Sequence, residues 1–247
     1  NVTLLDIAPR EGNDRNAIVR KGWEAVVKSR PAALMHPDNA QRVTLGNLDD
    51  NFSTIATADW VVEVVVERLE VKQQLMARID EARRPNAIIT TNTSCIPIRA
   101  IQEGRSESFR QHFCGTHFFN PPRYMKLLEL IPGPDTSQEV LDTLHHFMTY
   151  TLGKGVVIAI DRPNFVGNRI GSFAGQHRMN WIVENGYGVE EVDAISGPFI
   201  GNPKTATFRL MDLVGIDIAA GVSENLYHAV PEDEDRERLR RPAIVQS

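Results

Sequence analysis

Short runs of β-branched residues alternate with amphipathic helical spacing over the first two thirds of the chain. The runs have the length of buried parallel strands, and the segments between them repeat apolar residues every three to four positions. The predicted strands cover residues 2–6, 43–45, 60–66, 87–91, 113–118, 127–131 and 156–160. The predicted helices cover residues 14–28, 68–83, 96–101 and 137–152. This alternation predicts an α/β domain built on a doubly wound parallel sheet.

The β pattern stops at a polar break, Asp161-Arg162-Pro163-Asn164. Beyond the break every periodic segment has helical spacing: residues 165–185, 189–195, 207–214 and 218–229. We therefore predict two domains, an α/β domain over residues 1–161 and a smaller all-helical domain over residues 162–247.

Composition narrows the class of protein. The chain has 247 residues and a net charge of −5, and it lacks a dense basic cluster, so we do not expect it to bind nucleic acid. No apolar stretch reaches the roughly 18 residues of a membrane span. Cys95 and Cys114 lack a metal-ligand spacing, and the adjacent His145 and His146 would point to different faces of a helix. We expect reduced cysteines, no metal site and a cytoplasmic location.

Two polar residues twelve positions apart stand in strongly apolar sequence. His117 precedes Phe118-Phe119, and Glu129 follows Leu127-Leu128. A carboxylate in dry surroundings requires a partner, and a nearby imidazole can supply one. The carboxylate raises the basicity of such an imidazole, so the pair can act as a general base. The alternative is a histidine satisfied in the core beside a structural glutamate.

The residues around this pair, GTHFFNPPRYMKLLELI (115–131), resemble the L-3-hydroxyacyl-CoA dehydrogenases, the NAD-dependent enzymes of fatty-acid β-oxidation. The resemblance continues in VVEVVVERLEVKQQL (61–75), TTNTSCIPI (90–98) and DRPNFVGNRI (161–170). These motifs follow the order of the family from residue 1 to about residue 217. The resemblance implies a Rossmann-like NAD-binding domain followed by the helical domain.

The resemblance also implies the residues of the site. The catalytic residues would be His117, Glu129, Ser94 and Asn168. The matching histidine takes the proton of the 3-hydroxyl, the matching glutamate pairs with the imidazole, and the serine and asparagine contact the substrate. The residues near the cofactor would be Asp6, Glu67, Lys72, Asn92 and Asn120. Two simpler interpretations remain open: Ser94 as a helix N-cap, and Glu67 with Lys72 as a solvated helix start.

The start of the chain departs from the family. Asp6 ends the first strand of this chain, whereas in a dinucleotide-binding fold the acid that holds the adenosine ribose ends the second strand. Such an acid disfavours a 2′-phosphate, so we expect NAD and not NADP. Such an acid follows a glycine-rich turn by about 20 residues, yet the chain contains no G-x-G-x-x-G. Either that segment precedes Asn1 in the expressed protein or the protein lacks it. We favour the first and expect roughly 25–35 further residues upstream.

Taken together, the sequence predicts an oxidoreductase that converts L-3-hydroxyacyl-CoA to 3-oxoacyl-CoA with NAD. Two alternatives are a dehydrogenase of another 3-hydroxy acid and a non-catalytic, crystallin-like relative. The resemblance implies a homodimer formed through the helical domain, and it raises the prospect of a longer multidomain chain. The family pattern fails over residues 201–210, so acyl specificity is not predicted.

Overall fold

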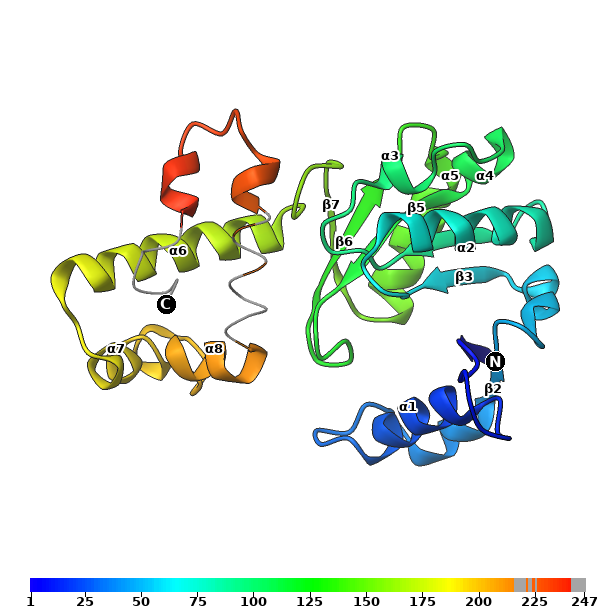
Figure 1. The fold of residues 1–247 in the computed structure, drawn as a ribbon, viewed down its shortest axis with the longest axis horizontal. Coiled ribbons are helices and arrows are strands. Elements are labelled where there is room, and N and C mark those ends of the chain that lie inside the picture. Colours follow the sequence, from blue (N-terminus) through cyan, green and yellow to red (C-terminus); the bar gives the residue numbers. More distant parts are fainter. Residues whose placement is uncertain (216–220, 222–223, 225, 241–247) are drawn as a thin grey trace. The chain divides into compact units, whose positions relative to one another are not determined.

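The computed structural model describes residues 1–215, 221, 224 and 226–240. The chain divides into two compact units, Asn1–Asp161 and Arg162–Ser247. Each unit is described by itself below, with the elements labelled in Figure 1.

The first unit begins with a two-stranded parallel sheet. β1 (Val2–Asp6) pairs with β2 (Val43–Asn47), and α1 (Ala17–Lys28) and the 3-10 helix η1 (Pro37–Arg42) lie between them in sequence. Lys28 ends α1 in the last turn, where a positive charge suits the helix dipole. The 3-10 helix η2 (Phe52–Thr57) then leads to the second sheet.

The second sheet has five strands in the order β3-β4-β5-β6-β7. The strands are β3 (Trp60–Glu63), β4 (Ile88–Thr91), β5 (Phe113–Phe118), β6 (Leu127–Pro132) and β7 (Gly155–Ile158). The helices that connect them are α2 (Leu69–Ala82), α3 (Ile98–Ile101), α4 (Glu107–Gln111) and α5 (Gln138–His146), and α5 continues as a π-helical turn, η3 (Phe147–Thr151). Figure 1 shows α2 lying along this sheet.

The sheet is parallel from β3 to β5, but β6 runs antiparallel to β5. The connection between these two strands covers only residues 119–126, whereas a parallel pair needs a crossover of about a dozen residues or more. β7 is parallel to β6, because α5 and η3 provide a crossover of sufficient length. The α/β class with a Rossmann-like parallel sheet is confirmed, with this antiparallel addition at one side.

Side-chain alternation separates the two faces of the sheet. Leu128 and Leu130 of β6 and Cys114 of β5 pack with α5 in one apolar core. The residues between them in sequence face the other way, and there Gly115 lies against Ile98 of α3. His117 and Glu129 belong to this second face, because they alternate with the core residues.

The structure shortens one predicted strand. β3 ends at Glu63, although the β-branched run continues to Val66. The Glu63 carboxylate accepts a hydrogen bond from the backbone N–H of Val65, 2.6 Å away, which turns the chain out of the sheet pairing. Val64 and Val66 are consequently exposed. The end of β3 is therefore set by a side-chain contact, which the pattern of apolar residues does not reveal.

The second unit is helical over its described residues, as predicted for this part of the chain. Its elements are α6 (Gly167–Asn185), α7 (Val189–Ile195), the 3-10 helix η4 (Pro198–Ile200), α8 (Phe208–Val214) and the 3-10 helix η5 (Arg236–Leu239). The Asp193 carboxylate of α7 accepts hydrogen bonds from the backbone N–H groups of Thr207, Phe208 and Arg209 and so fixes the start of α8. The predicted helix over residues 218–229 lies partly outside the described residues. Within the described part of the chain, no helix has both the length and the apolar character that crossing a bilayer requires.

Candidate active site

His117 and Glu129 form a buried pair across two strands. They are direct register partners in the antiparallel β5–β6 ladder, so their side chains leave the same face of the sheet. His117 Nδ1 lies 2.7 Å from Glu129 Oε2, and both residues are buried. The ring of Phe119 packs beside the imidazole at 4.6 Å between centroids. The contact predicted from two polar residues in apolar sequence is present.

A second buried ion pair lies where β3 ends. The Lys72 ammonium, on the first turn of α2, is 2.8 Å from Glu63 Oε1 and 3.1 Å from Glu63 Oε2. The Thr91 hydroxyl, at the end of β4, donates to Glu63 Oε2 at 2.6 Å. Glu63 and Thr91 were not predicted from the sequence as site residues. A charged residue inside a β-branched run was the signal for Glu63, because a buried carboxylate needs a partner.

Glu67 connects this pair to the turn that follows β4. Its Oε2 lies 3.2 Å from the Lys72 ammonium, and its Oε1 accepts the backbone N–H groups of Ser94 and Cys95 at 2.8 and 3.1 Å. The hydroxyl of Thr93 donates to the same Oε1 at 2.5 Å. Partial burial alone would raise the pKa of Glu67, but these hydrogen bonds and the Lys72 charge outweigh it and hold the pKa below the usual value.

Ser94 does not cap the following helix, contrary to the simpler of its two predicted roles. The residue that precedes α3 is Pro97, and the Asp161 carboxylate accepts the first helical N–H groups, those of Ile98 and Arg99. Ser94 instead sits in the turn held by Glu67. Capping therefore no longer explains the presence of a serine at this position.

Asn92 joins the ends of β4 and β5. Its backbone N–H donates to the Glu63 carbonyl at 2.9 Å, and its Oδ1 accepts the backbone N–H of Phe118 at 2.9 Å. Asn92 therefore places the Glu63 cluster and the His117 strand in one hydrogen-bonded framework. The carboxyl ends of β3, β4 and β5 meet at this edge, which is where ligands bind in open parallel sheets.

The remaining predicted residues lie outside this framework. Asp6 ends β1 of the other sheet, and its exposed carboxylate accepts the N–H of Ile7 at 2.7 Å. Asn120 is exposed in the loop after β5. Asn168 lies in the first turn of α6, in the second unit, and is partly buried. The structure thus brings together six of the nine predicted residues: His117, Glu129, Ser94, Glu67, Lys72 and Asn92.

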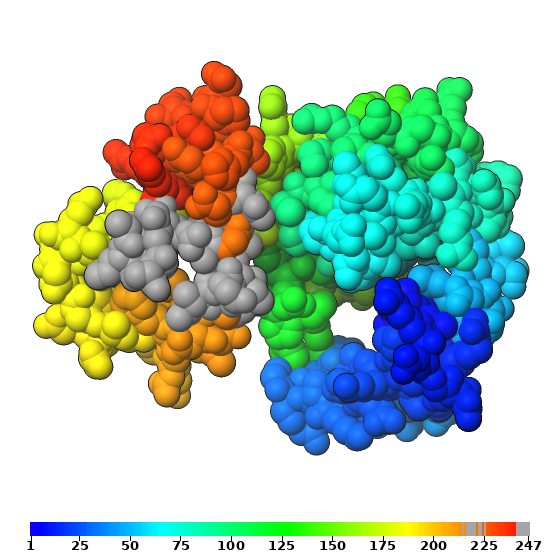
Figure 2. Space-filling view, viewed as in Figure 1, coloured from blue at the N-terminus to red at the C-terminus, as the bar shows by residue number. Residues whose placement is uncertain are grey.

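The loop that carries Asn120 is tied to the segment after α1. The Arg123 guanidinium donates to the carbonyls of Ala32 and Leu34 at 2.7 and 2.6 Å, and the Tyr124 hydroxyl donates to the Ala32 carbonyl at 2.9 Å. The two segments lie side by side in the space-filling view (Figure 2). The loop is therefore fixed at both of its ends and in its middle.

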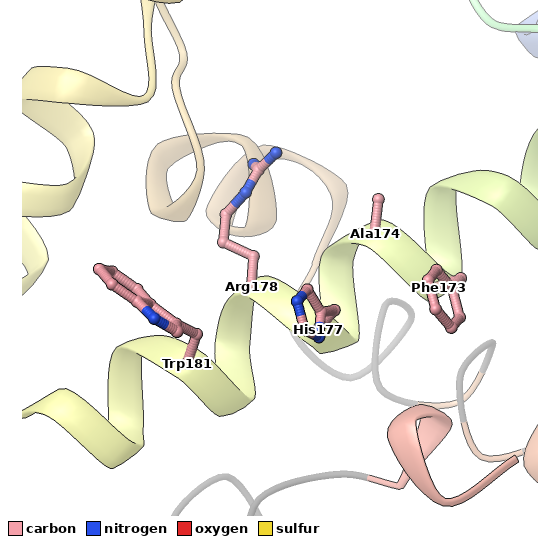
Figure 3. Close-up of a pocket in the computed structure, with 5 residues that line it drawn as sticks. All are labelled: Phe173, Ala174, His177, Arg178 and Trp181. Atoms are coloured by element: carbon pink, nitrogen blue, oxygen red, sulfur yellow. The ribbon is translucent and has the colours of Figure 1, made fainter. Parts of the chain in front are cut away.

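A surface depression in the second unit adds nothing to the predicted site, and the described residues add no metal site to it. A depression in the second unit is lined by five side chains of one helix, Phe173, Ala174, His177, Arg178 and Trp181 (Figure 3). None of the nine predicted site residues lines it. Among the residues that the structure describes, no group of three or more His, Cys, Asp or Glu side chains is arranged to hold a metal ion.

The groups at the edge of the sheets fit a nicotinamide dinucleotide. The exposed carboxylate of Asp6 and the partly exposed carboxylate of Glu67 can accept hydrogen bonds from ribose hydroxyls. Asp6 is the last residue of the parallel strand β1, and Glu67 comes shortly after the parallel strand β3. A carboxylate in the place of Asp6 would repel a 2′-phosphate, which suits NAD.

The comparisons with known proteins agree with this chemistry. Residues 1–162 match the family model "3-hydroxyacyl-CoA dehydrogenase, NAD binding domain", and residues 165–246 match "3-hydroxyacyl-CoA dehydrogenase, C-terminal domain". A probable 3-hydroxyacyl-CoA dehydrogenase of Deinococcus radiodurans is 42% identical over 95% of this chain and 68% of its own length. One of Bacillus subtilis is 42% identical over 99% of this chain, which spans only 33% of that relative.

A solved structure shows the same fold. The (S)-3-hydroxybutyryl-CoA dehydrogenase of Ralstonia eutropha superposes with a TM-score of 0.79 at 26% identity, over 100% of this chain and 83% of that one. The resemblance seen in the four sequence motifs is confirmed by these matches. The chain belongs to the 3-hydroxyacyl-CoA dehydrogenase family, and its first 162 residues are the NAD-binding domain of that family.

Proposed function

We propose that the protein oxidises L-3-hydroxyacyl-CoA to 3-oxoacyl-CoA with NAD. The observation that carries the proposal is the buried 2.7 Å contact between His117 Nδ1 and Glu129 Oε2. An alcohol becomes a ketone only if its hydroxyl proton is removed as hydride leaves the same carbon. The pair supplies a base for that proton in surroundings that strengthen the electrostatic interaction between its members.

In the proposed reaction each step involves a particular atom. Because Nδ1 of His117 faces Glu129, the hydroxyl proton would pass to Nε2. The Glu129 carboxylate would stabilise the imidazolium that results, and NAD, when bound, would supply the redox chemistry as acceptor of the hydride from C3 of the substrate. The electron pair of the broken O–H bond becomes the second bond between oxygen and C3, which gives the ketone. The reverse reaction returns both hydrogens.

The other predicted residues would bind and orient the reactants. Ser94 and Asn168 would hydrogen-bond the 3-hydroxyl or the thioester region of the substrate, and Asn92 and Asn120 would lie beside the cofactor. Asp6 and Glu67 would accept its ribose hydroxyls. Holding both reactants in register supplies a large part of the rate.

The preference for a CoA thioester is supported by the relatives. The Ralstonia neighbour is an (S)-3-hydroxybutyryl-CoA dehydrogenase, and a relative in Rickettsia felis, 37% identical over 94% of this chain, is a putative fatty acid oxidation complex trifunctional enzyme. This chain spans 32% of that relative. Activity within a longer multidomain protein is part of the proposal.

The test is an NADH consumption assay on the full-length protein with acetoacetyl-CoA and, separately, with free acetoacetate. We expect turnover of the thioester and little turnover of the free acid. The opposite preference would indicate a dehydrogenase of another 3-hydroxy acid. NADH binding without turnover of either compound would favour the non-catalytic, crystallin-like alternative.

A further inference from the structure

We propose that Glu63 is a positioning residue of the reaction: paired with Lys72, it sets the orientation of Glu67 and, through Glu67, the backbone turn that carries Ser94. The inference deepens the proposed dehydrogenase function and rests on it. The side chain of Glu63 is fully buried, so it acts through its neighbours.

Glu63 and Lys72 form a buried ion pair. The side chains of Lys72 and Glu63 are 1% and 0% exposed. Both Glu63 oxygens are occupied, Oε1 by the Val65 N–H and the Lys72 ammonium and Oε2 by the Thr91 hydroxyl. A buried ion pair becomes strongly unfavourable when one member loses its charge, because the other is left uncompensated. The position of Lys72 therefore depends on the charge of Glu63.

The Lys72 ammonium contacts oxygen atoms of the protein. An ammonium has three protons, and the structure offers the Lys72 ammonium three hydrogen-bond acceptors: Glu63 Oε1 at 2.8 Å, Glu63 Oε2 at 3.1 Å and the Val65 carbonyl at 3.3 Å, with Glu67 Oε2 as a second ion-pair partner at 3.2 Å. Lys72 is thus used to hold Glu67 in place, and a contact from Lys72 to a bound ligand would require breaking one of these interactions.

Glu67 also holds the backbone turn that contains Ser94 and Cys95. Glu67 holds Lys72 with one oxygen and the Ser94 and Cys95 N–H groups with the other. Its side chain is 36% exposed, so within this cluster it is the carboxylate that can also meet a ligand. Rotation of Glu67 would release both backbone N–H groups at once. The orientation of Ser94 and the ligand contact of Glu67 therefore depend on the same anchor.

The charge balance explains why two carboxylates are needed. Glu63 and Glu67 share one ammonium, so Glu67 keeps a surplus negative charge for the turn and the cofactor. Without the charge on Glu63, Lys72 would draw Glu67 toward itself as its sole counter-ion. Glu63→Gln, which preserves size and removes charge, isolates this effect.

The test compares Glu63→Gln with Asp80→Asn in the full-length protein. Asp80 lies near the other end of the same helix and accepts the N–H and hydroxyl of Ser106 at 2.8 and 2.7 Å, so it is a matched carboxylate-to-amide change away from the site. We expect Glu63→Gln to accelerate hydrogen exchange of the Ser94 and Cys95 amides about tenfold and to raise the KM for NAD about tenfold, with a smaller change in kcat. Asp80→Asn should accelerate exchange at Ser106 and leave both other quantities unchanged.

A second variant keeps the test decisive if Glu63→Gln does not fold. The double substitution Glu63→Leu with Lys72→Met replaces the buried pair by apolar groups, which stability usually tolerates, while Glu67 still loses its anchor. Unchanged exchange at Ser94 and Cys95, or an unchanged KM despite faster exchange, would overturn the inference. Exchange is measured without substrate, so an inactive wild-type protein would refute the proposed function while the exchange result still decides the positioning role.

Discussion

The proposed chemistry depends on the imidazole of His117. His117→Gln preserves size and removes the base, so kcat should fall by roughly 10²–10⁴. The change is measured as NADH consumption with acetoacetyl-CoA, with a circular dichroism spectrum and NADH affinity as controls for folding and cofactor binding. Turnover close to that of the wild type would remove His117 from the role of base.

Cys95 offers a second test at the scale of one side chain. Burial, together with the neighbouring Glu67 carboxylate, raises the pKa of this thiol from 9.0 to about 11. A raised thiol pKa means that the reactive thiolate forms only as the pH approaches that value, so at pH 8 the folded protein holds about 100-fold less Cys95 thiolate than an ordinary cysteine would.

We therefore expect slow alkylation of Cys95 by iodoacetamide at pH 8, increasing with pH up to about 11. Mass spectrometry of the labelled peptide measures the rate, and the denatured protein provides the reference. Glu67→Gln should speed the reaction because it removes the neighbouring negative charge. Labelling of the folded protein at the rate of the denatured one would contradict the assigned surroundings.

At the scale of elements, Gly115 sets how closely α3 approaches β5. A Cβ at this position would come within 2.8 Å of Ile98 Cδ1 and 3.0 Å of Ile131 Cδ1, and both isoleucines are fully buried. Gly115→Ala should lower the free energy of unfolding by about 1–3 kcal/mol because the core has no room for the added methyl group.

Urea denaturation measures this change, and Gly22→Ala is the matched control. Gly22 lies in α1, where a Cβ would meet nothing within 4 Å, so the same substitution should stabilise the protein by up to about 1 kcal/mol through helix propensity. Equal effects of the two substitutions would show that packing against α3 does not explain the glycine.

Local pattern predicted most elements of the fold because β-branched runs and helical periodicity are properties of adjacent residues. Helix α7 begins and ends at the predicted residues, Val189 and Ile195. The antiparallel turn into β6 is a consequence of the short connection at residues 119–126, which the alternation pattern does not register. The contacts of Glu63 with Thr91 and Lys72 join separate elements, so they become visible only when the strands are placed side by side.

At the scale of the whole molecule, two sequence-based predictions stay predictions. One is an upstream segment with a glycine-rich turn. Among the described strands, β1 pairs only with β2 and β3 only with β4, so each of the two sheets has an unpaired edge that a further strand could occupy. An intact mass near 27.7 kDa for the expressed protein would refute this prediction.

The other is a homodimer formed through the helical unit. Helix α6 presents large apolar side chains to solvent, including Ile170 at 65% and Trp181 at 48% exposed. Aromatic residues of this kind commonly dominate binding energy at interfaces, and a two-fold axis would bury each of them twice. We expect the full-length protein to have the mass of a dimer by light scattering at micromolar concentration.

Trp181→Glu should weaken that dimer by on the order of 10²–10³-fold in dissociation constant, since each of two symmetric contacts is worth about 2 kcal/mol. Tyr150→Glu is the control: Tyr150 is 75% exposed but lies on η3 of the first unit, so the same change of an exposed aromatic residue to a charged one should leave the mass unchanged. A monomeric wild-type protein would refute the dimer. Dissociation by Tyr150→Glu and not by Trp181→Glu would place the dimer contact away from α6. The activity assay on the Trp181→Glu monomer then separates assembly from chemistry, because His117 and Glu129 lie on adjacent strands of a single chain.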